Sequence, residues 1–234
     1  MKIIFNNIFE LISCLSLAII LFNGCKTKDT ISKGENKKPN IIFILADDLG
    51  AHDLSYAGSK FYETPNIDAL AKEGTIFMQG YAAAQVCSPS RASILTGKFT
   101  AHHGITDWIG ADYGENWAKK NNTKMLPPNY NRFISKKEVT IAEALKQNGY
   151  KTFFAGKWHL GNESSIPENY GFQINKGGWE VGNPKGGYYA PWENPKLDYN
   201  YKGENLTMRL AEETTNFISE NKDKPFFAFL SFYA

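Results

Sequence analysis

The strongest constraint on the fold of this chain is an apolar run from Pro39 to Ala46, with the sequence PNIIFILA. The run is continuous and rich in β-branched residues. Such a run is typical of a strand that is buried on both faces, as the strands of parallel sheets are. It ends abruptly in Asp47 and Asp48. We therefore expect a buried parallel strand that brings two carboxylates to one end of a sheet.

Further strands and helices alternate along the chain, as their start and stop signals indicate. The expected elements are helices from Pro65 to Gly74, from just after Cys87 to Gly97 and from Thr140 to Gly149, a strand from Tyr150 to Ala155, a helix from Thr207 to Asn221 and a strand from Pro225 to Ala234. This alternation predicts an α/β fold with a mostly parallel central sheet flanked by helices.

Two segments lead to expectations about exposure. The stretch from Gly161 to Gly203 is rich in Gly, Asn, Pro and aromatic residues, and we interpret it as a long surface excursion. The last apolar strand, from Phe226 to Tyr233, has nothing after it to cover its faces or its edge. We therefore expect that strand to be exposed and prone to association.

The first 25 residues have the pattern of an export signal. Lys2 precedes an apolar run from Ile8 to Phe22 that is too short and interrupted for a membrane-spanning helix. The run closes at Cys25 in a way that resembles a bacterial lipoprotein cleavage site. We expect export to the periplasm or cell surface, with lipid on Cys25 favoured over ordinary secretion and over a buried N-terminal helix. The polar residues 26–38 have the composition of a tether.

Composition argues against a nucleic-acid-binding role. The chain has 26 basic and 24 acidic residues, a net charge of +2 and no stripe of Lys and Arg. It therefore lacks the basic footprint of nucleic-acid-binding proteins. Its 42% hydrophobic content is ample for a packed core. Contact with a membrane is expected only through the lipid anchor.

Three cysteines are present, and two of them, Cys14 and Cys25, lie in the signal region. Cys87 is left without a thiol partner, which excludes a disulfide scaffold for this segment. Cys87 also starts an expected helix, where free N–H groups and the helix dipole favour an anion. Arg91, about one turn on, can offer a forked cation to an oxyanion. The alternative is that Cys87 is a small buried hydrophobe.

Two other polar pairs follow expected strands, at the end where open parallel sheets bind ligands. Asp47 and Asp48 would be satisfied by a shared calcium or magnesium ion, although a turn with one capping Asp is the alternative. Lys157 and His159 project to the same side if the strand persists. They combine a cation with an acid/base group, as ester cleavage requires. Alone, this second pair is weak evidence.

Taken together, these motifs resemble those of the sulfatases of the alkaline phosphatase superfamily. The matching segments are PNII at 39–42, DDLG at 47–50, TPNID at 64–68, CSPSRAS at 87–93, LTG at 95–97 and GKWHLG at 156–161. The Cys-x-Pro-Ser-Arg element is highly specific, and the others gain weight from their shared order. The resemblance implies that residues 39–234 are the N-terminal part of a sulfatase catalytic domain, truncated before its second half.

The resemblance also implies a modified residue and a metal ion. A formylglycine-generating enzyme would oxidise Cys87 to formylglycine, whose hydrated aldehyde is the nucleophile. Attack would leave a sulfate ester on residue 87, and the remaining hydroxyl would then expel sulfate. Asp47 and Asp48 would hold calcium together with the modified side chain. Further metal ligands and a further His would lie beyond the end of this chain.

Three more roles follow from the same resemblance. Arg91 would hold the formylglycine, Lys157 would bind the sulfate, and His159 would bind the substrate and orient or deprotonate the nucleophile. His102 and His103 lie outside the motif and receive no role beyond a place at the rim. The expected substrate is a sulfated polysaccharide or a sulfated small molecule.

Two other functions remain open from the sequence. One is a phosphodiesterase or phosphonate monoester hydrolase of the same superfamily, since a phosphoryl anion would fit the same cations. The other is an inactive glycan-binding surface lipoprotein that stacks sugars on loop aromatics. The candidates for stacking are Trp179, Tyr188, Tyr189 and Trp192.

Overall fold

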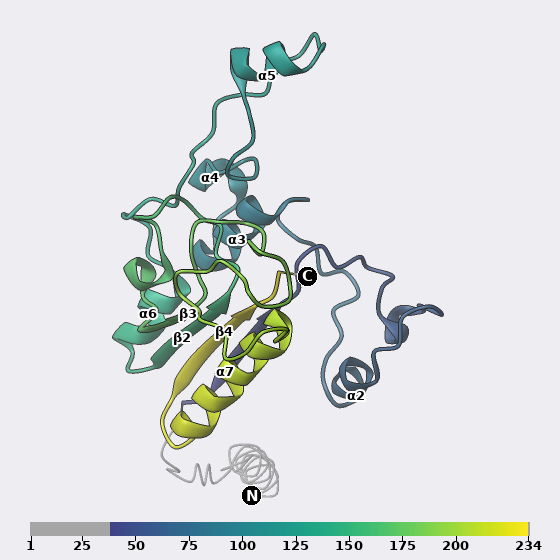
Figure 1. The fold of residues 1–234 in the computed structure, drawn as a ribbon, viewed down its shortest axis with the longest axis vertical. Helices are drawn as coiled ribbons and strands as arrows, with labels where there is room; N and C mark the ends of the chain where they lie inside the picture. The colour runs from purple at the N-terminus through teal and green to yellow at the C-terminus, as the bar shows by residue number, and fades with distance from the viewer. Residues whose placement is uncertain (1–37, 234) are drawn as a thin grey trace, which may run out of the picture. The chain divides into compact units, whose positions relative to one another are not determined.

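The computed structural model describes residues 38–233, and the described chain is organised around a four-stranded sheet (Figure 1). The strands are β1 (Ile41–Leu45), β2 (Lys151–Gly156), β3 (Ile174–Lys176) and β4 (Phe226–Ser231). Their order is β1-β4-β2-β3, and every neighbouring pair is parallel. The expected parallel sheet is confirmed. The expected export signal and Cys25 lie outside the described residues.

Helices connect the strands, and most begin and end at the expected signals. They are α2 (Pro65–Glu73), α3 (Cys87–Thr96), α4 (Thr100–His103), α5 (Gly114–Lys120), α6 (Ile141–Gln147) and α7 (Leu206–Asn221), with 3-10 turns η1 (Ser55–Ala57) and η2 (Pro167–Tyr170). At the start of α6, Thr140 and Glu143 form the predicted capping box. No helix within residues 38–233 has the length and apolar character needed to cross a membrane.

The sheet buries side chains on both faces because successive residues of a strand point to opposite sides. On one face Phe154, Phe227 and Phe229 pack in a cluster that includes residues of α3 and α6. On the other face Phe153 and Ala228 pack in a cluster that includes residues of α7. Because all neighbouring strands are parallel, their carboxyl ends lie at the same edge of the sheet.

The expectation that the last apolar strand lacks cover is wrong. Every residue of β4 is buried, because β1 and β2 pair with its two edges and the two clusters cover its faces. The exposed strand is β1 instead. Ile42 is 50% exposed and Ile44 is 59% exposed, while Ile41 and Phe43 pack against the core. The first strand is therefore partly buried on one face and exposed on the other, contrary to the expectation from its apolar run.

The segment from Gly161 to Gly203 is also more than a surface excursion. It supplies β3 and several fully buried aromatic side chains, among them Tyr170 and Phe172. Trp192 is only 5% exposed, and its indole N–H donates to the carbonyl oxygen of Leu197 at 2.8 Å. Pattern alone missed this burial because the segment has no regular period to reveal a buried face.

Candidate active site

The site forms at the carboxyl edge of the sheet, where strand register brings distant residues together. Leu45 of β1 and Gly156 of β2 both pair with Ser231 of β4. Asp47 lies two residues after β1 and Lys157 lies directly after β2, so the two side chains emerge close together and form an ion pair. Gly156 allows this close approach, since its φ is +101° and a Cβ there would lie 1.8 Å from the carbonyl oxygen of Ser231.

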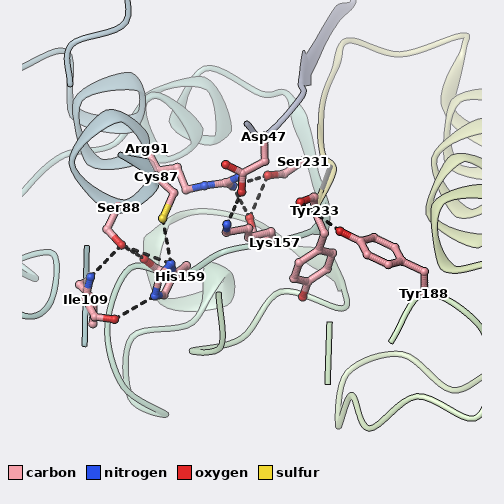
Figure 2. Close-up of polar contacts among 10 residues, drawn as sticks. All are labelled: Asp47, Cys87, Ser88, Arg91, Ile109, Lys157, His159, Tyr188, Ser231 and Tyr233. Carbon is pink, nitrogen blue, oxygen red and sulfur yellow. Dashed lines mark hydrogen bonds and ion pairs between the residues drawn. The ribbon is translucent and has the colours of Figure 1, made fainter. Parts of the chain in front are cut away.

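Asp47 is the centre of a buried charge cluster (Figure 2). Its Oδ2 atom accepts from Nη2 of Arg91 at 3.1 Å and forms a short ion pair with Nζ of Lys157. All three side chains are nearly inaccessible to solvent. One carboxylate thus faces two cations, so the cluster has a positive character that suits an anionic ligand.

Arg91 is held by more than its carboxylate partner. Its Nη1 atom donates to the carbonyl oxygen of Lys157 at 2.5 Å and to the hydroxyl of Ser231. Burial lowers the pKa of Arg91, and the carboxylate of Asp47 opposes that shift. Nε is buried and has no hydrogen-bond partner within residues 38–233. The guanidinium is therefore held in place, and both of its terminal nitrogens, Nη1 and Nη2, already donate to acceptors of the protein.

His159 faces Cys87 with a defined ring nitrogen. Its Nε2 atom lies 2.9 Å from the carbonyl oxygen of Ile109, which can only accept, so Nε2 bears the proton. Nδ1 is therefore the acceptor, and it lies 3.3 Å from Sγ of Cys87. Ser88 braces this arrangement, because its hydroxyl donates to the His159 carbonyl oxygen at 3.0 Å and accepts from the Ile109 N–H at 3.1 Å.

The protonation state and backbone of His159 suit a base. Burial lowers the pKa of His159 below its ordinary value of 6.5, and the nearby cations Lys157 and Arg91 lower it further. The neutral imidazole is therefore the favoured form at neutral pH. The backbone φ of His159 is +53°, a left-handed conformation that non-glycine residues adopt where the surrounding structure imposes it. Asp48 shares that property, with φ +56°.

Two cavities meet at Cys87. One, of about 640 Å³, is lined by Asp47, Asp48 and Arg91 among others. The second, of about 480 Å³, is lined by Lys157 and His159 among others, and Cys87 lines both. The residue at position 87 therefore has carboxylates on one side and a base on the other. This is the arrangement expected of a nucleophile beside a metal site.

The described residues offer some of the oxygen donors that a divalent cation would need. Asp47 and Asp48 offer carboxylate oxygens, which calcium and magnesium prefer. Both cations of the cluster approach Oδ2 of Asp47, and Asp48 is exposed. Within residues 38–233 no group of three or more His, Cys, Asp or Glu side chains could hold a metal ion. Calcium takes about six to eight oxygens. The donor chemistry fits a hard cation, but the coordination is incomplete.

The structure brings together the sequence candidates Asp47, Asp48, Cys87, Arg91, Lys157 and His159 around two adjoining cavities. His102 is exposed, and His103 is buried with Nε2 2.9 Å from the Ser93 hydroxyl. Neither lines either cavity.

Three contributors to the site had no role assigned from the sequence: Ser88, Ile109 and Ser231. Ser231 could have been predicted from the sequence, because it is a polar residue at the end of an apolar strand, where open parallel sheets bind ligands. The backbone groups of Ile109 act through position alone, which no residue pattern reports. The proposed stacking residues do not line the cavities either, whereas Trp108 does.

Comparison with known proteins gives the family. The Sulfatase family model matches residues 39–234. An arylsulfatase of Hemicentrotus pulcherrimus is 33% identical in an alignment of 218 residues that covers 83% of this chain and 37% of that protein. An N-acetylglucosamine-6-O-sulfatase of Bacteroides thetaiotaomicron is 33% identical in an alignment of 220 residues that covers 91% of this chain and 33% of that protein. The chain belongs to the sulfatase family and spans about a third of these relatives.

Comparison with solved structures also gives sulfatases. The structure of Ps i-CgsB in complex with k-i-k-neocarrahexaose has a TM-score of 0.65 at 29% identity, covering 84% of this chain and 45% of that one. The structure of BT4656 with its substrate D-glucosamine-2-N,6-O-disulfate has a TM-score of 0.64 at 30% identity, covering 85% and 35%. The sheet and its flanking helices are those of the alkaline phosphatase-like sulfatase fold, present here in part.

Proposed function

We propose that this chain is part of a sulfuric ester hydrolase that cleaves sulfate monoesters of carbohydrates. The observation that carries the proposal is the position of Cys87, with the acceptor nitrogen of His159 at 3.3 Å and the cationic cluster around Asp47 beside it. Two relatives are named as sulfatases of N-acetylated sugars, which supports a carbohydrate ester.

The described side chains divide the work of ester cleavage. Lys157 and Arg91 supply positive charge for the sulfate oxygens, which gain charge as the ester bond breaks. His159 accepts a proton at Nδ1 from the side chain of residue 87, because Ile109 holds the other ring nitrogen as a donor. Ser88 keeps the imidazole aligned through the two backbone contacts of its hydroxyl.

Two groups are proposed to complete the chemistry. Cys87 would be converted to formylglycine by a formylglycine-generating enzyme, and Asp47, Asp48 and residue 87 would hold calcium. When present, calcium would polarise the sulfate oxygens, and the formylglycine hydrate would supply the attacking oxygen. Support comes from the unpaired Cys87 within its motif and from the carboxylates that line the same cavity.

The test is to express the full-length protein with and without a formylglycine-generating enzyme. Peptide mass spectrometry should find an aldehyde at residue 87 only with that enzyme, and only that sample should hydrolyse an aryl sulfate. Cys87→Ala is the matched inactive control. Active protein with an intact, alkylatable Cys87 would refute the mechanism. Faster cleavage of a matched aryl phosphodiester would favour the phosphodiesterase alternative.

We also propose that residues 1–25 direct export and that Cys25 is lipidated, which places the domain in the periplasm or at the cell surface. The support is the apolar run that closes at Cys25. Labelling of cells with a fatty acid should mark the wild-type protein and not Cys25→Ser. Equal labelling of both, or no labelling of either, would leave ordinary secretion as the better interpretation.

A further inference from the structure

The cavity of about 480 Å³ beside Cys87 has walls of two kinds. Cys87, Lys157 and His159 form the catalytic part. The remaining lining comes from Trp108 and Ile109 and from residues 180–183. The reaction makes no use of the side chains on this second wall. They are nevertheless held beside the reacting group, where the organic part of an ester substrate would lie.

The segment around Trp108 is anchored to the catalytic base. Both backbone groups of Ile109 are bonded, one to the Ser88 hydroxyl and one to His159. The carbonyl oxygen of Trp108 accepts from the Tyr130 hydroxyl at 2.9 Å. A Cβ at Gly110 would lie 2.6 Å from Cζ3 of the indole, so the ring rests on that backbone. Trp108 is 46% exposed, lines the cavity and lies on a backbone segment that these contacts anchor.

The segment from residue 180 to 183 is seated on the same base. The N–H of His159 donates to the carbonyl oxygen of Trp179 at 3.2 Å. At Gly182 a Cβ would lie 2.4 Å from Nδ1 and from Cε1 of His159, so the backbone lies against the imidazole. Both parts of the second wall are therefore positioned relative to His159. A ligand held by this wall is held in register with the reacting atoms.

Glu180 provides the charge on this wall. This residue is partly buried and lines the cavity. Among residues 38–233 it has no hydrogen-bond or ion-pair partner, whereas the nearby cations are engaged with Asp47. An ionised carboxylate accepts hydrogen bonds and has none to donate. It therefore favours hydroxyl or ammonium groups and repels a second anion close to the one being cleaved.

We propose that Trp108 and Glu180 form a subsite for a sugar ring whose only anionic group near the cavity is the scissile sulfate. The indole stacks on the ring, and the carboxylate accepts from its hydroxyl groups or from an amine. This subsite rests on the proposed sulfatase activity and specifies its substrate class. It selects against sugars that carry a second sulfate or a carboxylate on the same ring.

The first test compares Glu180→Gln with the wild type in the full-length, formylglycine-containing protein. The substrates are phenyl sulfate, monosulfated galactose and N-acetylglucosamine, and their disulfated counterparts. We expect the preference in kcat/KM for monosulfated over disulfated sugar to fall about tenfold, because the repelling charge is gone. Phenyl sulfate has no second anion for Glu180 to repel, so its turnover reports the sulfatase activity separately from the sugar preference. Glu163→Gln, at an exposed position that does not line the cavity, is the matched control.

The second test is Trp108→Ala, with Trp108→Phe as the conservative variant. We expect the KM for monosulfated sugar to rise about tenfold in Trp108→Ala with little change in kcat, and Trp108→Phe to restore most of the loss. An unchanged sugar preference in Glu180→Gln would overturn the subsite, and so would an unchanged KM in Trp108→Ala. In either case, turnover of phenyl sulfate by the wild type would still support the proposed sulfatase activity. If the wild type cleaves no sulfate ester, the proposed function fails and the subsite with it.

Discussion

Nδ1 of His159 lies 3.3 Å from Sγ of Cys87, although 72 positions separate the two residues in the chain. Cys87 begins α3, whereas His159 follows β2. The Ile109 carbonyl oxygen determines which imidazole nitrogen is the acceptor. The contact thus combines three segments of chain, and it places a neutral base against the proposed nucleophile.

We predict that His159→Gln lowers turnover of aryl sulfate by about 10²–10⁴-fold, the usual contribution of a positioned general base. Gln cannot accept and pass on the proton of residue 87. Steady-state kinetics on the full-length protein measure the loss. His102→Gln, at an exposed position outside both cavities, should keep wild-type turnover. A fully active His159→Gln variant would remove His159 from the mechanism.

Asp47 and Asp48 should differ in what their removal does. Asp47→Asn leaves Arg91 and Lys157 buried without a carboxylate partner, so the free energy of unfolding should fall by about 3–5 kcal/mol. Asp48 is exposed, so Asp48→Asn should leave stability nearly unchanged. Both variants should bind calcium more weakly. Denaturant unfolding measures the stability of the two variants, and calcium titration measures their affinity for the ion. Equal losses of stability in the two variants would contradict the different roles given to Asp47 and Asp48.

The buried His103 should make the fold sensitive to acid. Burial lowers its pKa below the ordinary 6.5, and its Nδ1 accepts from the Ile105 N–H. Below pH 6.5 the unfolded chain takes up a proton that the folded chain resists. The free energy of unfolding therefore falls as pH drops from 6.5 towards the lowered pKa, and is unaffected above 6.5.

The measurement for His103 is denaturant unfolding over a pH series, for the wild type and for His103→Gln. The Gln side chain can accept from Ile105 and donate to Ser93 without titrating. The variant should lose less stability on acidification than the wild type. Parallel pH profiles for the two proteins would show that His103 makes no contribution to acid sensitivity.

Strand β1 should govern the association of residues 39–234 expressed alone. Among residues 38–233, β1 is an edge strand of the sheet, and its side chains Ile42 and Ile44 are exposed, which favours edge-to-edge pairing. Replacing both with Thr keeps the β-branched shape and should yield a monomer by light scattering. Ile141→Thr, at a similarly exposed helix position, should have no effect. A wild-type fragment that is monomeric would show that the exposed edge of β1 does not drive association.

Local signals in the sequence predicted much of the fold. The capping box at Thr140 placed α6, and Gly97 placed the end of α3, because such residues satisfy backbone needs within a few positions. The burial of β4 and the exposure of Ile42 and Ile44 could not be predicted in this way. Strand order decides which strand has neighbours on both edges, and order depends on contacts between segments far apart in the chain.

The sequence by itself determined the chemistry of the site: a cysteine in a specific motif, two carboxylates at a strand end, and the Lys157 and His159 pair. Only the tertiary structure decided how these groups act on one another. It gave Asp47 two buried cations, left Nδ1 of His159 as the acceptor, and brought Trp108 and Glu180 to the same cavity. The physical reason is that residue types set donor, acceptor and charge, whereas partners follow from the register of parallel strands and the anchoring of loops.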